Sequence, residues 1–114
     1  MPREYKLYLE DILESICKIE RYTENLSFDD FVKNELVQDG VARNLEIIGE
    51  AVKNISDDIK KRKSEVEWKK IAGLRDILIH AYFGIDVDIV WDVVKNKIPK
   101  LKENIVEILS QERR

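Results

Sequence analysis

The sequence predicts an all-α protein, an antiparallel bundle of about five helices forming a single domain over residues 1–114. Three observations predict this fold. Apolar residues recur every three or four positions along nearly the whole chain, which is the spacing of one helix face. Only four glycines and two prolines are present, too few for the many turns of an all-β fold. No internal repeat, low-complexity stretch or linker divides the chain, whose length is typical of one domain.

The first helix is expected over residues 3–25, because an apolar stripe runs down one face of this segment. The stripe consists of Tyr5, Leu9, Ile12, Ile16, Ile19 and Tyr22. Cys17 follows Ile16 directly, and we expect it to be a small, mostly buried side chain. Nothing nearby would stabilise a thiolate, so no reactive thiol is expected.

Ser27 and Asp30 have the spacing of a capping box, which predicts a short second helix. A long third helix is expected over residues 36–62, where the apolar periodicity is strongest. Its stripe consists of Val37, Val41, Leu45, Ile48, Val52, Ile55 and Ile59. Gly40 and Gly49 lie inside this helix, where a glycine costs about 1 kcal/mol relative to alanine. Close backbone packing at these glycines is the expected compensation.

The polar segment 63–67 is expected to be a loop, and a fourth helix to begin near Trp68. Gly84 is well placed to end that helix as a C-terminal cap. Asp86 or Asp88 can then cap the next helix.

The last apolar stripe continues to the end of the chain. It consists of Trp91, Val94, Ile98, Leu101, Ile105 and Ile108. Pro99 interrupts the stripe without shifting its phase. We therefore expect a helix that is kinked or briefly broken near Pro99 and that ends at about Glu112.

The charge distribution argues against a globally basic nucleic-acid-binding protein, because the net charge is −3. The charge is uneven, however: residues 1–59 carry a net −7 and residues 60–75 a net +5. This basic segment includes Lys69 and Lys70 and can meet a polyanion. It can equally be a solvated helix end, since cations are favourable near a helix C-terminus.

Several other classes are excluded by composition. A single cysteine excludes a disulfide framework and a cysteine-rich zinc site. No apolar run approaches the roughly 20 residues of a membrane helix. The N-terminus is charged from its third residue, which is unlike a signal peptide. We therefore expect a cytoplasmic protein that has no membrane segment, holds no metal and needs no cofactor.

A polar group interrupts the apolar pattern of the fourth helix. His80 is the only histidine, and it follows Arg75 and Asp76 and precedes Tyr82. On a helix, Asp76 and His80 share a face one turn apart, so the carboxylate can hold the imidazole and favour its charged form. Arg75 and His80 lie about 140° apart around the axis. Only the long arginine side chain, or a second copy of the helix, would bring both to one phosphate.

A purely structural interpretation of this group is also open. His80 and Tyr82 can be buried side chains held by hydrogen bonds, and Arg75 can be paired with an Asp or Glu. A Ser-His-Asp arrangement is unsupported, because no serine has the context of a nucleophile elbow. A lone histidine without cysteines supplies no ligand set for zinc.

The pattern Arg75-x-x-x-x-His80-x-Tyr82 resembles the R-x(4–6)-H motif of the HEPN superfamily of helical domains. More narrowly, it resembles the R-x-x-x-x-H-x-Tyr form of HepT-like toxins. Further segments are similar to that family in the same order, so the resemblance covers nearly the whole chain. These segments are 45–51, 68–75, 80–84 and 90–91. Asp76 stands where such toxins often have Asn, a position at which HEPN motifs accept several polar residues.

The resemblance implies a HEPN-like toxin of a type VII toxin–antitoxin pair that cleaves RNA without a metal. Such domains form homodimers in which two motif helices face each other across a cleft. By analogy, His80 would move the proton of a ribose 2′-hydroxyl or leaving oxygen, with Asp76 in support. Arg75 would stabilise the charge that builds on the phosphate. The products would be a cyclic phosphate and a 5′-hydroxyl end.

The resemblance also implies an antitoxin, a nucleotidyltransferase of the MntA type. It would silence the toxin by attaching AMP to Tyr82, which adds negative charge and bulk where the RNA phosphate must sit. Lys69 and Lys70 are the expected RNA-binding cations.

Two other functions stay open. The chain can be a non-catalytic helical subunit that binds nucleotide or substrate for a partner nucleotidyltransferase. It can also be a plain homodimeric scaffold, although the presence of both Arg75 and His80 favours a ribonuclease over a scaffold.

Overall fold

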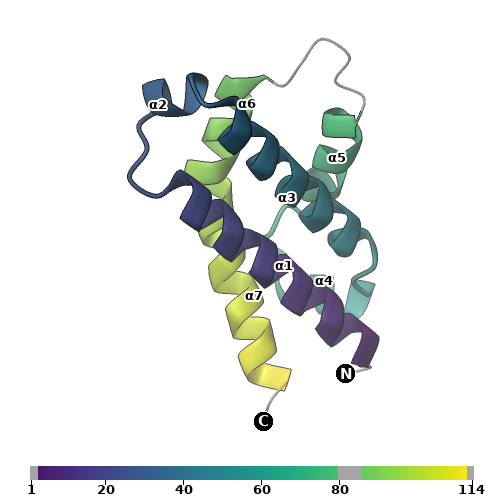
Figure 1. Ribbon diagram of the computed structural model, residues 1–114. Helices are drawn as coiled ribbons and strands as arrows, with labels where there is room; N and C mark the ends of the chain where they lie inside the picture. The colour runs from purple at the N-terminus through teal and green to yellow at the C-terminus, as the bar shows by residue number, and fades with distance from the viewer. Residues whose placement is uncertain (1–2, 80–85, 113–114) are drawn as a thin grey trace.

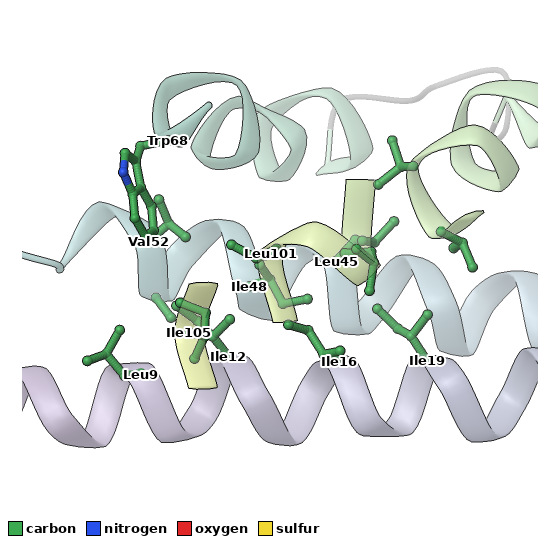
Figure 2. Packing of buried hydrophobic residues seen from close by; sticks show 14 of the residues in the cluster. Leu9, Ile12, Ile16, Ile19, Leu45, Ile48, Val52, Trp68, Leu101 and Ile105 are labelled. Carbon is green, nitrogen blue, oxygen red and sulfur yellow. The ribbon is translucent and has the colours of Figure 1, made fainter. Parts of the chain in front are cut away.

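The computed structural model describes residues 3–79 and 86–112, and every regular element in those two ranges is a helix. Three of them lie side by side: α1 (Arg3–Thr23), α3 (Glu35–Lys53) and α5 (Trp68–Ile79). The middle helix, α3, runs antiparallel to α1 and separates it from α5 (Figures 1 and 2). α7 (Ile98–Glu112) packs against α1. The predicted all-α bundle is confirmed.

Most of the core is built from aliphatic side chains of α1, α3 and α7, and the shorter elements add the rest, including Phe31 and Trp68. Figure 2 shows Ile12 and Ile16 of α1 meeting Ile48 of α3, with Leu101 and Ile105 of α7 closing the same cluster. All five are at most 2% exposed. This burial is the main stabilising contribution to a bundle of this kind, at roughly 1.5–3 kcal/mol for each such side chain.

α1 buries the predicted stripe from Leu9 to Ile19, but Tyr22 is exposed and the helix ends two residues earlier than expected, at Thr23. The Thr23 hydroxyl donates to the Ile19 carbonyl at 2.8 Å, which satisfies a carbonyl in the last turn. The expectation for Cys17 is wrong: its side chain is exposed. Ile16 is buried, and the next residue lies about 100° further round the helix, on the solvent side.

The predicted capping box is confirmed at α2 (Phe28–Val32). The Ser27 hydroxyl accepts the Asp30 N–H at 3.1 Å, and the Ser27 N–H donates to the Asp30 carboxylate at 3.0 Å. This backbone hydrogen bond lowers the pKa of Asp30, because it favours the ionised carboxylate.

The single long helix expected over residues 36–62 is wrong, because the chain forms α3 and a separate α4 (Asp57–Arg62). The Asn54 N–H ends α3 by donating to the Ala51 and Val52 carbonyls. The Ser56 hydroxyl starts α4 by accepting the Ile59 N–H at 3.4 Å. The Asn54 side-chain amide also donates to the Glu50 carbonyl, at 2.9 Å. Short polar side chains such as those of Asn54 and Ser56 compete for backbone groups and favour helix ends. The apolar spacing concealed the break because the residues on both sides of it stay buried.

α5 begins at Trp68, as predicted. The Trp68 indole N–H donates to the Lys60 carbonyl at 3.2 Å and to the Lys63 carbonyl at 3.0 Å, so it ties α5 to the end of α4. The expected end at Gly84 lies outside the described residues. Asp86 caps α6 (Val87–Asp92), as one of the two predicted caps.

The helix irregularity expected near Pro99 takes the form of a π-helical turn, η1 (Val93–Lys97), between α6 and α7. The Ile98 N–H donates to the carbonyl of Val93, five residues back. Pro99 then occupies the first turn of α7, where its missing N–H is tolerated. No helix in the described part of the chain is long and apolar enough to span a membrane.

Candidate active site

Arg75 lies where α5 crosses Gly49 of α3. A Cβ atom built on Gly49 would lie 3.0 Å from the Arg75 Cβ and 3.2 Å from both the Arg75 backbone nitrogen and the Ile71 carbonyl oxygen. Only glycine therefore leaves room for α5 at this distance from α3. The expected close packing at the glycines of α3 is confirmed here, and at Gly40, whose Cβ would lie 3.2 Å from the Tyr22 ring.

The Arg75 guanidinium contacts two carboxylates. Its Nε lies 2.8 Å from Glu50 Oε2, and one terminal nitrogen lies 3.3 Å from Asp76 Oδ1. The ion pair expected in the purely structural interpretation is therefore present. An arginine has five N–H donors, and these two contacts use two of them. The side chain is 35% exposed, so the guanidinium is still accessible to an anion.

A depression of about 450 Å³, the Arg75 hollow, lies beside this arginine. It is lined by Tyr8, Asp11, Arg43, Glu46, Ile47, Glu50, Ala51, Asn54 and Arg75. Three of these side chains are acidic and two are basic. Because an RNA phosphate is repelled by carboxylates, the hollow of one chain is a poor polyanion site by itself, and further cations are needed beside Arg75.

Asp76, predicted to support His80, is exposed and pairs with cations. Its Oδ1 lies 3.5 Å from the Lys53 Nζ as well as 3.3 Å from Arg75. His80 and Tyr82 lie outside the described residues, so their positions relative to Arg75 and Asp76 stay predictions.

Lys69 and Lys70 are exposed in the first turn of α5 and line a different depression of about 630 Å³, the lysine hollow. It is lined by Lys53, Asp57, Lys60, Val66, Glu67, Trp68, Lys69, Lys70 and Ala72. The structure thus places the two predicted RNA-binding lysines on α5 with Arg75, but not in the Arg75 hollow.

The charge of Lys70 is partly compensated. Its Nζ lies 2.7 Å from Glu67 Oε2, a hydrogen bond that raises the pKa of Lys70. Lys97 of η1 also reaches Glu67, at 3.3 Å, and both lysines lower the pKa of that carboxyl. Lys60, the first residue of the predicted basic segment, and Lys53, which was not predicted, add two cations to the same hollow.

Glu50 and Lys53 are the site residues that the sequence did not reveal. Both lie on α3, whereas their partners Arg75 and Asp76 lie on α5. A signal for Glu50 was present, because it lies beside Gly49 in one of the segments that resemble HepT-like proteins. Its pairing with Arg75 depends on how α3 and α5 pack, which the apolar spacing does not specify.

Replacing Gly49 by alanine is expected to lower the free energy of unfolding by about 1–3 kcal/mol, because the new methyl group overlaps the backbone of α5. Gly73 provides the matched control, since a Cβ there meets nothing within 4 Å. Gly73→Ala is expected to raise stability by up to about 1 kcal/mol. Urea denaturation measures both variants. Equal changes in the free energy of unfolding for the two variants would contradict the close approach of α3 and α5.

The family model described as "Ribonuclease HepT-like" matches residues 12–108. The chain belongs to the HepT-like ribonuclease family. The HepT-like match includes every predicted site residue, from Lys69 to Tyr82.

Individual HepT-like relatives agree with this assignment. A protein of Thermococcus cleftensis named "Probable ribonuclease HepT" is 51% identical over 102 residues, which cover 90% of this chain and 93% of the relative. A "Putative RNase" of Caldanaerobacter subterraneus subsp. tengcongensis is 43% identical over 106 residues, covering 93% of this chain and 95% of the relative.

A third relative, from Methanocaldococcus jannaschii, is named "Gamma-glutamylcyclotransferase and putative RNase". It is 47% identical over 111 residues, which cover 97% of this chain but 50% of the relative. The HepT-like chain therefore spans half the length of that protein. No solved structure gives a significant match.

Proposed function

We propose that this HepT-like protein is a metal-independent endoribonuclease, the toxin of a toxin–antitoxin pair, and that it acts in the cytoplasm. The observation that carries the proposal is the accessible Arg75 guanidinium, which is fixed at the α3–α5 contact and keeps N–H donors for an anion. Family membership supplies the substrate class, RNA, and Arg75 supplies a phosphate-binding group in the matched region.

The proposed reaction is an internal transesterification of RNA. His80 removes the proton of a ribose 2′-hydroxyl, and the 2′-oxygen forms a bond to the adjacent phosphorus. The bond from phosphorus to the 5′-oxygen breaks, and the leaving oxygen takes a proton from the imidazolium of His80, which returns to its neutral form. Arg75 stabilises the negative charge that builds on the phosphate oxygens in the transition state. The products are a 2′,3′-cyclic phosphate and a 5′-hydroxyl end, without a metal.

A homodimer completes the proposed site. α5 lies at the edge of the bundle, and four of its apolar side chains pack against the core but stay partly exposed in the single chain: Ile71, Ala72, Leu74 and Leu78. A twofold interface along α5 would cover these side chains and bring each copy of the motif close to the other. It would also supply the additional cations that the Arg75 hollow of one chain does not have.

Lys69 and Lys70 are proposed to bind the RNA backbone beyond the cleaved phosphate. Both are exposed on the same helix as Arg75, about one to two turns before it. Lysine contacts with phosphates do not select an RNA sequence. Loss of either lysine is therefore expected to lower RNA affinity and to make that affinity less dependent on salt concentration.

Control by an antitoxin is proposed at Tyr82. An MntA-like nucleotidyltransferase would transfer AMP from ATP to the Tyr82 hydroxyl, releasing pyrophosphate. The adduct would place a negative phosphodiester seven residues after Arg75 in the sequence, within the same motif, where it would compete with RNA.

A second candidate function is a non-catalytic subunit that binds nucleotide for a partner nucleotidyltransferase. The pairing of Arg75 with Glu50 and Asp76 favours it, because a guanidinium held by two carboxylates has less charge to offer a transition state. A single nucleotide would also be less strongly repelled by the acidic Arg75 hollow than a polyanion.

RNA cleavage in EDTA separates the two functions. Purified protein is incubated with a labelled RNA, and the 3′ ends of the products are identified by their resistance to phosphatase before acid treatment. The ribonuclease proposal expects cleavage in EDTA with cyclic phosphate ends. No cleavage with or without Mg²⁺ would favour the non-catalytic subunit, whereas cleavage only after Mg²⁺ is added would contradict the metal-independent mechanism.

A further inference from the structure

The shortest contact of the Arg75 guanidinium is with a residue of another helix. Glu50 Oε2 lies 2.8 Å from Arg75 Nε, whereas the adjacent Asp76 is 3.3 Å from a terminal nitrogen. A charge-assisted hydrogen bond of 2.8 Å is in the strong range for N–H···O contacts. Glu50 therefore restrains the guanidinium from outside α5.

The two ends of the Arg75 side chain are fixed by neighbouring residues of α3. Gly49 lets the Arg75 Cβ lie against the α3 backbone, and Glu50 then holds the guanidinium. An arginine side chain has several rotatable bonds, so a free one loses rotamer entropy when it is ordered. Restraint at both ends removes most of that freedom before RNA arrives.

This pair contributes little to the stability of the fold. The side chains of Arg75 and Glu50 are 35% and 55% exposed, and ion pairs in such surroundings are screened by water. Removal of the Glu50 carboxylate should therefore leave the fold intact, so its effect on the orientation of Arg75 can be measured separately from its effect on stability.

We propose that Glu50 is a positioning residue that orients the Arg75 guanidinium for the cleaved phosphate. The inference rests on the proposed ribonuclease function. Glu50 takes the Nε–H and leaves terminal N–H groups of the guanidinium to bind phosphate oxygens. It does not touch the RNA, and its carboxylate repels the substrate. Glu50 thus favours turnover at some cost in RNA affinity.

The first measurement observes the restraint directly and needs no activity. Relaxation of the ¹⁵Nε–H group of Arg75 is recorded by NMR in the wild type and in Glu50→Ala, with the exposed Arg43 as an internal reference. Arg75 is expected to be more ordered than Arg43 in the wild type and to become as mobile in the variant. Equal mobility of the two arginines in the wild type would overturn the inference.

The second measurement separates turnover from binding. Glu50→Ala is expected to lower kcat for RNA cleavage by about 10- to 100-fold, the effect of misplacing a catalytic group. Its KM is expected to be unchanged or lower, because a carboxylate beside the phosphate is gone. Glu50→Gln keeps an oxygen that accepts the Nε–H, and it is expected to retain kcat within about threefold of the wild type.

Glu20→Ala is the matched control. Glu20 Oε1 lies 2.8 Å from Lys102 Nζ, an equally short and exposed ion pair between α1 and α7. Both alanine variants are expected to unfold at the same temperature as the wild type within about 2 °C, and only Glu50→Ala to lose kcat.

A failure of the proposed ribonuclease function and a failure of the positioning role of Glu50 give different results. A wild type that does not cleave RNA contradicts the proposed function, and the NMR comparison still decides whether Glu50 orients Arg75. Unchanged kcat in Glu50→Ala, with Arg75→Ala inactive, contradicts the positioning role alone. A rise in KM without loss of kcat would also contradict it.

Discussion

Replacing Arg75 by alanine is expected to lower the rate of RNA cleavage by about 100- to 1,000-fold, the usual effect of removing a charged donor from a transition state. His80→Ala is expected to lower it by about 100- to 10,000-fold, because proton transfer from the 2′-hydroxyl loses its base. Arg75→Lys should recover part of the activity, since it restores the charge without the planar fork of donors. Single-turnover cleavage in EDTA measures these rates.

Stability and charge must be controlled in this comparison. Arg75 is partly exposed, so its alanine variant should unfold within about 1 kcal/mol of the wild type. Arg21→Ala, at the exposed end of α1, removes the same charge far from the motif and should cleave at the wild-type rate. Cleavage by Arg75→Ala within threefold of the wild type would contradict the assigned role.

Replacing Tyr82 by phenylalanine is expected to leave RNA cleavage within about tenfold of the wild type and to abolish silencing by the nucleotidyltransferase. The variant keeps the aromatic ring but has no hydroxyl oxygen to form the bond to AMP. The protein is incubated with its nucleotidyltransferase partner and ATP, and then its mass and its RNA cleavage are measured. The wild type should gain one or more adenylyl groups and lose activity.

Either of two results would contradict the proposed silencing through Tyr82. One is that the wild type gains no adenylyl mass, and the other is that Tyr82→Phe is silenced as fully as the wild type. Tyr22→Phe is a suitable control, since Tyr22 is an exposed tyrosine on α1 that should not affect modification.

Much of the fold was predictable because burial and helix periodicity coincide in a small bundle. Ile12, Ile16 and Ile48 were placed on the correct faces by their spacing alone. The break between α3 and α4 was not predictable in this way. It depends on the Asn54 backbone N–H, which donates to carbonyls of α3, and on the Ser56 hydroxyl, which accepts the Ile59 N–H. Neither hydrogen bond changes the apolar spacing.

Less of the candidate site was predictable. The sequence located Arg75 and Asp76 on one helix, and the structure agrees. It did not predict that Glu50 and Lys53 meet them, because those contacts are between residues more than 20 positions apart. The exposure of Cys17 was also not predicted. Cys17 follows the buried Ile16, but its side chain lies on the solvent side of α1.

The central claim is that RNA is cleaved at a site where two protomers bring Arg75 and His80 to one phosphate, and complementation between inactive variants tests it most directly. Arg75→Ala and His80→Ala chains are co-expressed with different tags, and dimers carrying both tags are isolated and assayed in EDTA. Such a dimer holds one intact Arg75 and one intact His80 on opposite chains. If the pair acts across the interface, it should recover up to about half of the wild-type rate, one of two symmetric sites. A mixed dimer as inactive as either parent would show that the two residues do not act across an interface.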